Sequence, residues 1–454
     1  MTPRAEPARS ATRIEAEYAR RHPESARFAE RARRVCPGGV SQAFRDTQPF
    51  PICYERAAGA RKWTVDGAEV VDYSMGHGSL ILGHGDPDVE EAVRAQLARG
   101  THFTGVSAPE IDLAELVCEL MPGAEAVRFT ATGSEACMLA IRLARSATGK
   151  DRFIKFAGHY HGWHDHTFIA LRPPYDRPHT GGVPQAVRDQ CIVLPPNDAA
   201  AVERALSDRD DIACVIVEPA GGGHGTVPTS VEWIRALREL TRAHGIPLIF
   251  DEMVSGFRLA PGGYQEWSGV HADLTALGKT MFGGFPGGAV AGRADLMNLT
   301  RVGADRFVAH WGTWNAFPVA CAAGATALRK LRDGSVQARI AEHGERVRAE
   351  LNRAIASVGA AARVYGMGSH IHFLLRPWPF TGDSEEPPGG RHAELALDPD
   401  QYRLFRMAML VQGVDVDHGN NISALHGDAE AERIRAAFTA TLEMMLADGL
   451  IAAA

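Results

Sequence analysis

The sequence has little of several features that mark whole classes of protein. Only seven of its 454 residues are cysteine, and no two of them form a Cys-x-x-Cys pair. The chain therefore lacks the spacing of a zinc ribbon or a dithiol redox motif, and we expect buried, reduced thiols. No run approaches the roughly 18 consecutive apolar residues that a membrane helix needs, so the sequence predicts no membrane partner.

An apolar N-terminal core and an excess of positive charge are missing as well. The opening sequence MTPRAEPARSATRIEAEYARR interleaves arginine with glutamate, which predicts a solvated helix face rather than a secretory signal. A cytoplasmic location follows as the expectation. The formal net charge is −7 and the pI about 6.3. Because no basic patch dominates the chain, no nucleic acid partner is expected.

What is present suits a large globular protein: 45% of the residues are hydrophobic and 23% charged. Short apolar runs bounded by turn residues alternate with amphipathic segments. The predicted strands are Val127–Phe129, Arg152–Phe156, Ile192–Leu194, Ala213–Val217, Pro247–Phe250, Leu274–Leu277 and Gly288–Ala291. Helical patterns lie at Ser134–Thr148 and Val231–His244, the second preceded by the capping-box spacing Thr229-Ser-Val-Glu232. The alternation predicts an α/β fold, with helices on both faces of a mostly parallel sheet.

The two ends of the chain have a different pattern. Residues 1–75 contain a helical pattern and a hairpin-like stretch, Lys62–Tyr73, that turns at Asp66-Gly67. The C-terminal part predicts a long helix at 336–358, a strand at 369–375, a polar loop at 377–399, and helices at 400–412 and 429–446. We therefore predict a large domain at 76–330, a small α+β domain at 331–454, and an N-terminal segment, 1–75, that joins the small domain.

One turn has the properties of a phosphate cradle. The strand Val127–Phe129 runs into Gly133, and a helix opens at Ser134. A helix N-terminus offers free backbone N–H groups and a partial positive charge, and glycine lets an anion approach the backbone closely. Taken alone, a strand–glycine–helix turn is also a common structural device.

Two strands end in charged residues. The sequence IPLIFD ends in Asp251, at the carboxyl edge of the sheet where open α/β folds bind ligands. That acid could equally cap a helix or pair with an arginine. The sequence LTALGK ends in Lys279, just before a glycine-rich loop. A partly desolvated lysine is nucleophilic and can form a Schiff base with an aldehyde, although a structural lysine is the alternative.

Together, the three motifs point to one cofactor. Pyridoxal 5'-phosphate (PLP) needs a lysine for its aldehyde, a carboxylate for its pyridinium nitrogen and an anion cradle for its phosphate. Lys279, Asp251 and the turn at Gly133 supply these three groups. The sequence therefore predicts a PLP enzyme.

In these motifs the chain resembles the class III aminotransferases, which are PLP-dependent transferases of fold type I. The resemblance covers about residues 30–445 and depends on TATGSEACMLAIRLAR, KFAGHYHGWHD, VIVEPAGG, LIFDEMVSGFRLA, ALGKTMFGGFPGGA and GTWNAFP. The chain is most similar to the glutamate-1-semialdehyde aminomutase-like group. The phrases GHGSLILGHG, GHYHGWHD and FRMAMLVQGVDV resemble the D-phenylglycine aminotransferases in particular. The resemblance implies a mostly parallel seven-stranded sheet in a large domain, with a small α+β domain beside it.

The resemblance assigns the central roles to four residues. Lys279 would be the Schiff-base lysine and the group that moves the substrate proton. Asp251 would bind the pyridinium nitrogen. Gly133 and Ser134 would donate backbone N–H groups to the phosphate.

Four further cofactor contacts are implied in the same way. Tyr160 would stack on the ring, and Met253 would pack on its opposite face, where the family usually has valine. Glu218 would brace the Asp251 side of the pocket. Thr313 would reach the phosphate of the partner subunit, so that a homodimer with active sites at the subunit interface is expected.

The substrates are expected to be a small-molecule amino donor and an oxo-acid acceptor. Arg45 is the candidate for the substrate carboxylate, because guanidinium can donate two parallel hydrogen bonds; a surface arginine is the alternative. His77 falls where the family often has an aromatic pocket residue, although it could be a turn histidine. Tryptophan-rich loops around Trp163, Trp311 and Trp314 favour an aromatic donor.

Two departures from the family pattern matter. Phe317-Pro318 stands where Asn-Pro is usual, and the stretch VDVDHGNNISALHG after Gly413 is shorter than in true aminomutases and lacks their glutamate. This favours transamination. The alternative is a PLP-dependent isomerase, either a glutamate-1-semialdehyde aminomutase or an amino-acid racemase. A catalytically silent scaffold is a third possibility, which the complete set of motifs disfavours.

The histidines of the sequence HGWHDH, residues 161–166, resemble metal-ligand spacing. They fall within the expected stacking loop, however, and no partner HxxE or CxxC motif accompanies them. No metal site is predicted.

Overall fold

The structure is a computed structural model that describes residues 12–176, 180–380, 387, 389–417 and 419–454. Residues 1–11 of the opening sequence and residues 381–386 and 388 of the predicted polar loop lie outside the described residues. Among the described residues, no helix is both long and apolar enough to span a membrane.

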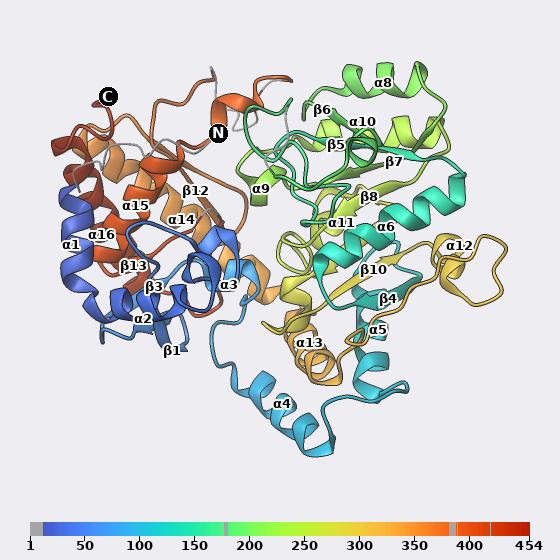
Figure 1. Cartoon of the computed structure of the whole chain (residues 1–454), viewed down its shortest axis with the longest axis horizontal. Helices are drawn as coiled ribbons and strands as arrows, with labels where there is room; N and C mark the ends of the chain where they lie inside the picture. The colour runs from blue at the N-terminus through green and yellow to red at the C-terminus, as the bar shows by residue number, and fades with distance from the viewer. Residues whose placement is uncertain (1–11, 177–179, 381–386, 388, 418) are drawn as a thin grey trace.

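The middle of the chain forms one seven-stranded sheet in the order β4-β10-β9-β8-β7-β5-β6 (Figure 1). The strands are β4 (Ala126–Thr130), β5 (Arg152–Phe156), β6 (Cys191–Leu194), β7 (Ile212–Val217), β8 (Leu248–Asp251), β9 (Leu274–Gly278) and β10 (Gly288–Gly292). β10 runs antiparallel to β4 and β9, and the pairs from β9 to β6 are parallel. All seven predicted strands are therefore confirmed, as is the mostly parallel sheet.

Helices cover both faces of this sheet. Cys214 and Ile216 of β7 pack in the cluster beneath α6 (Gly133–Thr148), whereas Val215 and Val217 pack in the cluster formed with α8 (Ala199–Ser207) and α10 (Val231–Ala243). Successive side chains of a strand point to opposite faces, so an apolar run buried on both sides requires helices on both sides. The predicted α/β layering is confirmed.

Further helices surround the sheet. α13 (Pro318–Leu331) packs against α4 (Pro87–Arg99) and α5 (Ala108–Leu120) at the lower edge of the molecule in Figure 1. The short helices are α3 (Met75–Gly78), α7 (Gln185–Arg188), α9 (Gly222–Gly225), α11 (Gly263–Ser268) and α12 (Ala294–Met297). The 3-10 turns are η1 (Pro37–Gly39), η2 (Ala43–Arg45), η3 (Lys279–Phe282), η4 (Asn298–Thr300) and η5 (His392–Leu395).

The N-terminal and C-terminal parts share a second sheet, in the order β1-β2-β3-β13. Its strands are β1 (Tyr54–Ala58), β2 (Arg61–Thr64), β3 (Glu69–Asp72) and β13 (Val414–Asp415). β2 and β3 form the predicted hairpin, and β13 pairs with β3 in parallel. The domain boundaries at 75/76 and 330/331 stay a proposal, which this pairing of the two ends supports.

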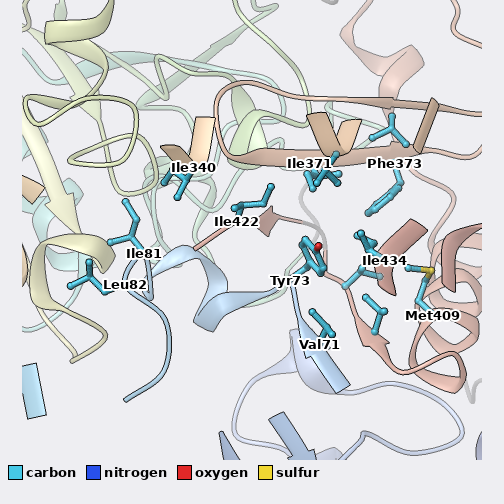
Figure 2. Close-up of a cluster of buried hydrophobic side chains, with 14 of the residues drawn as sticks. Val71, Tyr73, Ile81, Leu82, Ile340, Ile371, Phe373, Met409, Ile422 and Ile434 are labelled. Carbon is cyan, nitrogen blue, oxygen red and sulfur yellow. The ribbon is translucent and has the colours of Figure 1, made fainter. Parts of the chain in front are cut away.

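A common apolar core lies beneath this sheet (Figure 2). It joins Val71 and Tyr73 to side chains of the C-terminal helices and of β12. The C-terminal elements are α14 (Ser335–Val358), β11 (Arg363–Tyr365), β12 (His370–Leu374), α15 (Pro399–Val411), β14 (Asn420–Asn421) and α16 (Asp428–Ala447). The three predicted C-terminal helices and the predicted strand are confirmed.

Three local expectations need correction. The capping box at Thr229 is wrong: the N-cap of α10 is Ser230, whose hydroxyl accepts from the Trp233 amide at 3.1 Å. Thr229 is buried, and its hydroxyl donates instead to the Pro219 carbonyl at 2.6 Å. Cys118 is exposed, although Cys137, Cys214 and Cys321 are buried as expected. The first 75 residues contain two helices, α1 (Arg13–Arg21) and α2 (Pro23–Arg33), rather than one.

Candidate active site

Lys279 and Asp251 lie at the same edge of the large sheet. Asp251 is the last residue of β8 and Lys279 directly follows β9, which pairs with β8 in parallel. Met253 connects this edge to the turn at Gly133. Its sulfur lies 2.5 Å from where a Cβ on Gly133 would stand, and 2.7 Å from the corresponding position on Gly278. The structure therefore brings the three predicted motifs together.

Asp251 is held by three donors. Its side chain is buried, and Oδ2 lies 2.8 Å from Nδ1 of His161 and 3.4 Å from the thiol of Cys137. Oδ1 accepts from the Met253 amide at 3.1 Å. An ionised carboxylate only accepts hydrogen bonds, so Nδ1 of His161 carries the proton. Burial lowers the pKa of His161, and the nearby Asp251 opposes that shift.

The contact of His161 with Asp251 is not predicted from the sequence, in which His161 stands out only for its metal-like histidine spacing. Its place next to Tyr160 in the loop sequence HYHGW is the available signal. Ligand atoms of Cys137, His161 and Asp251 lie within 4.8 Å of one another. Because the thiol and imidazole both point at the carboxylate, we interpret the group as a support for Asp251.

Lys279 is placed for nucleophilic chemistry. Burial lowers the pKa of its amine to about 8 because the charged form loses hydration. The negative charges of Asp251 and Glu218 oppose this shift, and the cation of Arg258 adds to it. A neutral amine is the form that bonds an aldehyde, so the site makes more of this reactive form available at a given pH than an exposed lysine would offer.

This shift predicts a pH profile in the cofactor-free protein. An amine whose pKa is lowered from 10.5 to about 8 is half neutral near pH 8 and protonated below it. We expect acylation of Lys279 by an amine-reactive reagent to have its pH midpoint near 8. The midpoint for an exposed lysine lies about 2 pH units higher. Peptide mass spectrometry would separate Lys279 from Lys155, a second buried lysine whose pKa burial lowers to about 8. A midpoint near 10 at Lys279 would contradict the assignment.

The anion cradle is the N-terminus of α6, a helix of 16 residues. Thr132 caps this helix by accepting from the Glu135 amide at 3.2 Å, and Gly133 and Ser134 begin its first turn. A Cβ on Gly162 would lie 2.6 Å from the Cα of Ser134, so the loop that follows His161 packs tightly on this turn. Free N–H groups closed in by glycine contacts suit a phosphate.

Glu218 supports the loop that carries Tyr160. Its Oε1 accepts from the Tyr160 amide at 2.6 Å and from the Gly223 amide at 3.1 Å. The side chain of Tyr160 is partly exposed, and its ring meets Phe168 edge-on. Glu218 therefore contacts the loop that carries Tyr160. The side chain bonded to Asp251 is the imidazole of His161.

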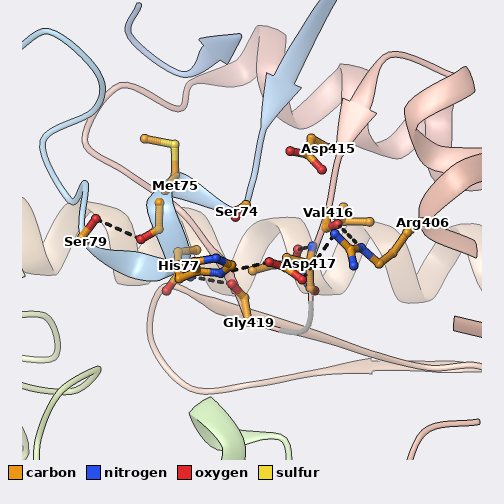
Figure 3. Close-up of polar contacts among 12 residues, drawn as sticks. Ser74, Met75, His77, Ser79, Arg406, Asp415, Val416, Asp417 and Gly419 are labelled. Atoms are coloured by element: carbon orange, nitrogen blue, oxygen red, sulfur yellow. Dashed lines mark hydrogen bonds and ion pairs between the residues drawn. The ribbon is translucent and has the colours of Figure 1, made fainter. Parts of the chain in front are cut away.

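The candidate substrate residues Arg45 and His77 come from two segments that meet through Phe44. Arg45 ends η2 and is exposed. The ring of its neighbour Phe44 meets the His77 ring at 5.8 Å. His77 points to Asp417, with Nδ1 3.0 Å from Oδ2 (Figure 3). Thr313 lies apart from them on an exposed loop, where its carbonyl contacts Nε2 of His102.

The arrangement fits the needs of PLP. A buried acid, a partly desolvated lysine and a glycine-lined helix N-terminus converge at one sheet edge, and each has the chemistry that one part of the cofactor requires. The Met253 side chain packs so closely on Gly133 and Gly278 that a Cβ at either position would require it to move.

Comparison with known proteins identifies the family of this chain. The family model described as aminotransferase class-III matches residues 42–375. A glutamate-1-semialdehyde 2,1-aminomutase from Methanopyrus kandleri is 36% identical over 437 residues, which cover 94% of this chain and 99% of that protein.

Two solved structures are also similar. An omega-transaminase from Sphaerobacter thermophilus is 38% identical, with a TM-score of 0.85 over 92% of this chain and 97% of that one. A β-phenylalanine aminotransferase from Variovorax paradoxus is 31% identical, with a TM-score of 0.86 over 97% and 98% of the two chains. The chain therefore belongs to the class III aminotransferase family of PLP-dependent enzymes, and it has their fold type I architecture.

Proposed function

We propose that this enzyme is a transaminase that moves an amino group from an amino acid to a 2-oxo acid in two half-reactions. The observation that carries the proposal is the convergence of Lys279, Asp251 and the α6 N-terminus at one edge of the sheet. When bound, PLP supplies an aldehyde and a ring that accepts electrons from the substrate.

The residues of the chain would divide the remaining work. Lys279 would hold the cofactor through its amine and, once released, move the proton at the substrate carbon. Asp251, fixed by His161, would keep the ring nitrogen protonated. The Gly133 and Ser134 amides would bind the phosphate.

Side chains around the ring would hold it in place. Tyr160 would cover one face of the ring, positioned by Glu218 through its backbone. Met253 would cover the opposite face. Glu218 binds the backbone amides of Tyr160 and Gly223, and Met253 lies against Gly133 and Gly278. We expect these residues to orient the ring without taking part in proton transfer.

Arg45 is proposed to bind the substrate carboxylate, with His77 beside it. The guanidinium of Arg45 is exposed, and the ring of Phe44 contacts His77. An aromatic donor is proposed because of the aromatic side chains in the loops around Trp163 and Trp314, which are 75% and 56% exposed. Initial rates across aromatic and aliphatic donors would test this, and a clear aliphatic preference would rule it out.

Replacing Arg45 with alanine is expected to raise KM for an amino acid donor about 10-fold or more, because a charge-assisted hydrogen bond is lost. The rate with an arylalkylamine that has no carboxylate should not change. Arg34→Ala serves as the control, since Arg34 is an exposed arginine paired with Glu30. Equal losses with both donors would show that Arg45 does not recognise the carboxylate.

An isomerase is the second candidate, and the curated relatives favour it. Proteins named glutamate-1-semialdehyde 2,1-aminomutase match this chain at 36–37% identity over more than nine-tenths of its length. Against this, the first glutamate after Gly413 is Glu430, and it pairs with Arg61 at 2.7 Å. We therefore favour transamination over the aminomutase and over an amino-acid racemase.

One experiment separates these reactions. The purified enzyme is mixed with single amino donors in the absence of any oxo acid, and the visible absorbance is followed. A transaminase converts its cofactor to the amine form and stops after this first half-reaction. An isomerase continues to turn over without an acceptor, which would overturn the proposal. If the protein shows no PLP absorbance even after PLP is added, this result would support the catalytically silent scaffold.

We also propose that the active unit is a homodimer with active sites at the subunit interface. Trp311 and Trp314 flank Thr313 on its loop and are 89% and 56% exposed. Large exposed aromatic side chains are typical of interfaces. Light scattering should give twice the mass of the 48.9 kDa chain, and a monomer that retains full activity would contradict the shared site.

A further inference from the structure

Arg258 is an unusual residue in this molecule because it is a buried cation for which the described residues provide no acidic partner. Its side chain is 1% exposed and is one of the largest fully buried side chains of the described residues. Within the described part of the chain, no carboxylate lies within ion-pair distance of it. Burial lowers the pKa of its guanidinium to about 10, so the group still carries its charge at neutral pH. A buried charge is costly unless it is well hydrogen-bonded.

The hydrogen bonds of Arg258 join three separate segments. Nη2 donates to the carbonyl of Gly78 at 2.7 Å. Nη1 donates to the hydroxyl of Ser369 and to the carbonyl of Ile422, both at 3.1 Å. Gly78 precedes the large sheet, whereas Ser369 and Ile422 belong to the C-terminal part. The Arg258 side chain therefore connects the segment that follows Asp251 with Gly78 and with the C-terminal part of the chain.

The segment that ends at Gly78 has a strained backbone. Met75, Gly76, His77 and Gly78 have φ values of 45°, 61°, 55° and 86°, so four consecutive residues adopt the left-handed region. This conformation costs roughly 1–2 kcal/mol for each residue other than glycine. It persists only when surrounding contacts hold it.

The contacts that hold this left-handed turn come from several sides. Asp72 accepts from the Met75 amide at 3.0 Å, and Asp417 meets His77 (Figure 3). The Gly78 carbonyl is shared: it also accepts from the hydroxyl of Thr280 at 3.3 Å. Thr280 directly follows Lys279. The turn that presents His77 is thus linked, through a single carbonyl, to Arg258 and to the neighbour of the catalytic lysine.

We propose that Arg258 is a positioning residue that holds the turn carrying His77 in register with Lys279. The inference rests on the proposed function, in which Lys279 and His77 act at one site. The charge of Arg258 has a second effect at that site, since it contributes to the lowered pKa of Lys279. The first effect needs the hydrogen-bonding geometry of the guanidinium, whereas the second needs only a positive charge at this position.

Two variants separate the geometry from the charge. Arg258→Lys keeps the charge but cannot reach three acceptors with one ammonium. Arg258→Met removes both. The matched control is Arg238→Met, because Arg238 is another arginine with little exposure. It pairs with Asp273 at 2.7 Å, just before β9 begins at the opposite edge of the sheet.

The first measurement is amide hydrogen exchange in the cofactor-free protein. We expect exchange in residues 74–80 to rise about 10-fold or more in both Arg258 variants, because charge-assisted hydrogen bonds that close the turn are lost. Arg238→Met should leave those residues unchanged. Wild-type exchange at 74–80 in both Arg258 variants would overturn the proposal, as would an equal rise in the control.

The second measurement is the pH midpoint of Lys279 acylation, also without cofactor. Removing a nearby cation favours the protonated amine, so the midpoint should move upward in Arg258→Met and stay near the wild-type value in Arg258→Lys. If Arg258→Met does not fold, the exchange result for Arg258→Lys decides the question alone. Neither measurement uses turnover, so a failed search for an amino donor would count against the proposed function and leave this inference standing.

Discussion

Lys279→Ala is expected to lower turnover by about 10³-fold or more, since the substitution removes both the amine that bonds the cofactor and the group that moves the substrate proton. The amine is partly desolvated, and its pKa is lowered to about 8, which suits both tasks. Steady-state rates with the best amino donor would measure the loss.

A chemical signature should accompany the loss of rate. Borohydride should fix the cofactor irreversibly on the wild-type chain and leave Lys279→Ala unlabelled. Lys279→Arg should be equally inactive, because guanidinium keeps its proton and cannot act as the nucleophile. Lys330→Ala is the control, since Lys330 pairs with Asp86 at 2.7 Å, outside the site. Labelling of Lys279→Ala at another lysine with retained turnover would show that the wrong residue has been assigned.

Asp251→Asn is expected to lower turnover about 10³-fold while leaving the shape of the site nearly unchanged. The amide carries no charge and cannot hold a proton on the ring nitrogen. It also presents a donor where the Nδ1 proton of His161 and the thiol of Cys137 need an acceptor. We therefore expect a loss of about 1–3 kcal/mol in the free energy of unfolding as well.

The two effects of Asp251→Asn can be separated with Asp273→Asn. Asp273 is also buried, at the amino-terminal end of β9, and it accepts from Arg238 and Arg293. Its loss should lower stability without a comparable loss of turnover. Equal activity of wild type and Asp251→Asn at saturating donor would contradict the role of the carboxylate. His161→Gln should give a smaller loss, because it disturbs the position of Asp251 and leaves its charge in place.

Much of the large sheet could be predicted, because its strands are short, β-branched and buried on both faces. Such runs have few alternatives between turn residues. The positions of Asp251 and Lys279 follow from the same reasoning, since a charged residue at the end of an apolar strand lies at the sheet edge. The strands β8 and β9 end as expected.

The parts that could not be predicted depend on contacts between distant segments. Nothing local in the sequence indicates that Arg258 bonds to Gly78 and Ile422, or that Asp417 meets His77. Four consecutive left-handed residues at Met75–Gly78 contradict local preference. The capping box failed for a related reason: a tertiary hydrogen bond to Pro219 engages Thr229, and its neighbour Ser230 caps the helix.

The pairing of β3 with β13 has a consequence for synthesis of the chain. Val71 lies opposite Val414, so a strand made early has no partner on that side until nearly the whole chain has left the ribosome. Contacts of such long range form slowly, and the apolar surface that awaits them stays exposed in the nascent chain. The side chains of Ile14, Tyr18 and Val71 belong to the core that the C-terminal helices complete. We expect ribosome-bound chains that stop before α15 to need a chaperone. Crosslinking of chaperones to residues 14–71 in nascent chains of increasing length would measure this binding.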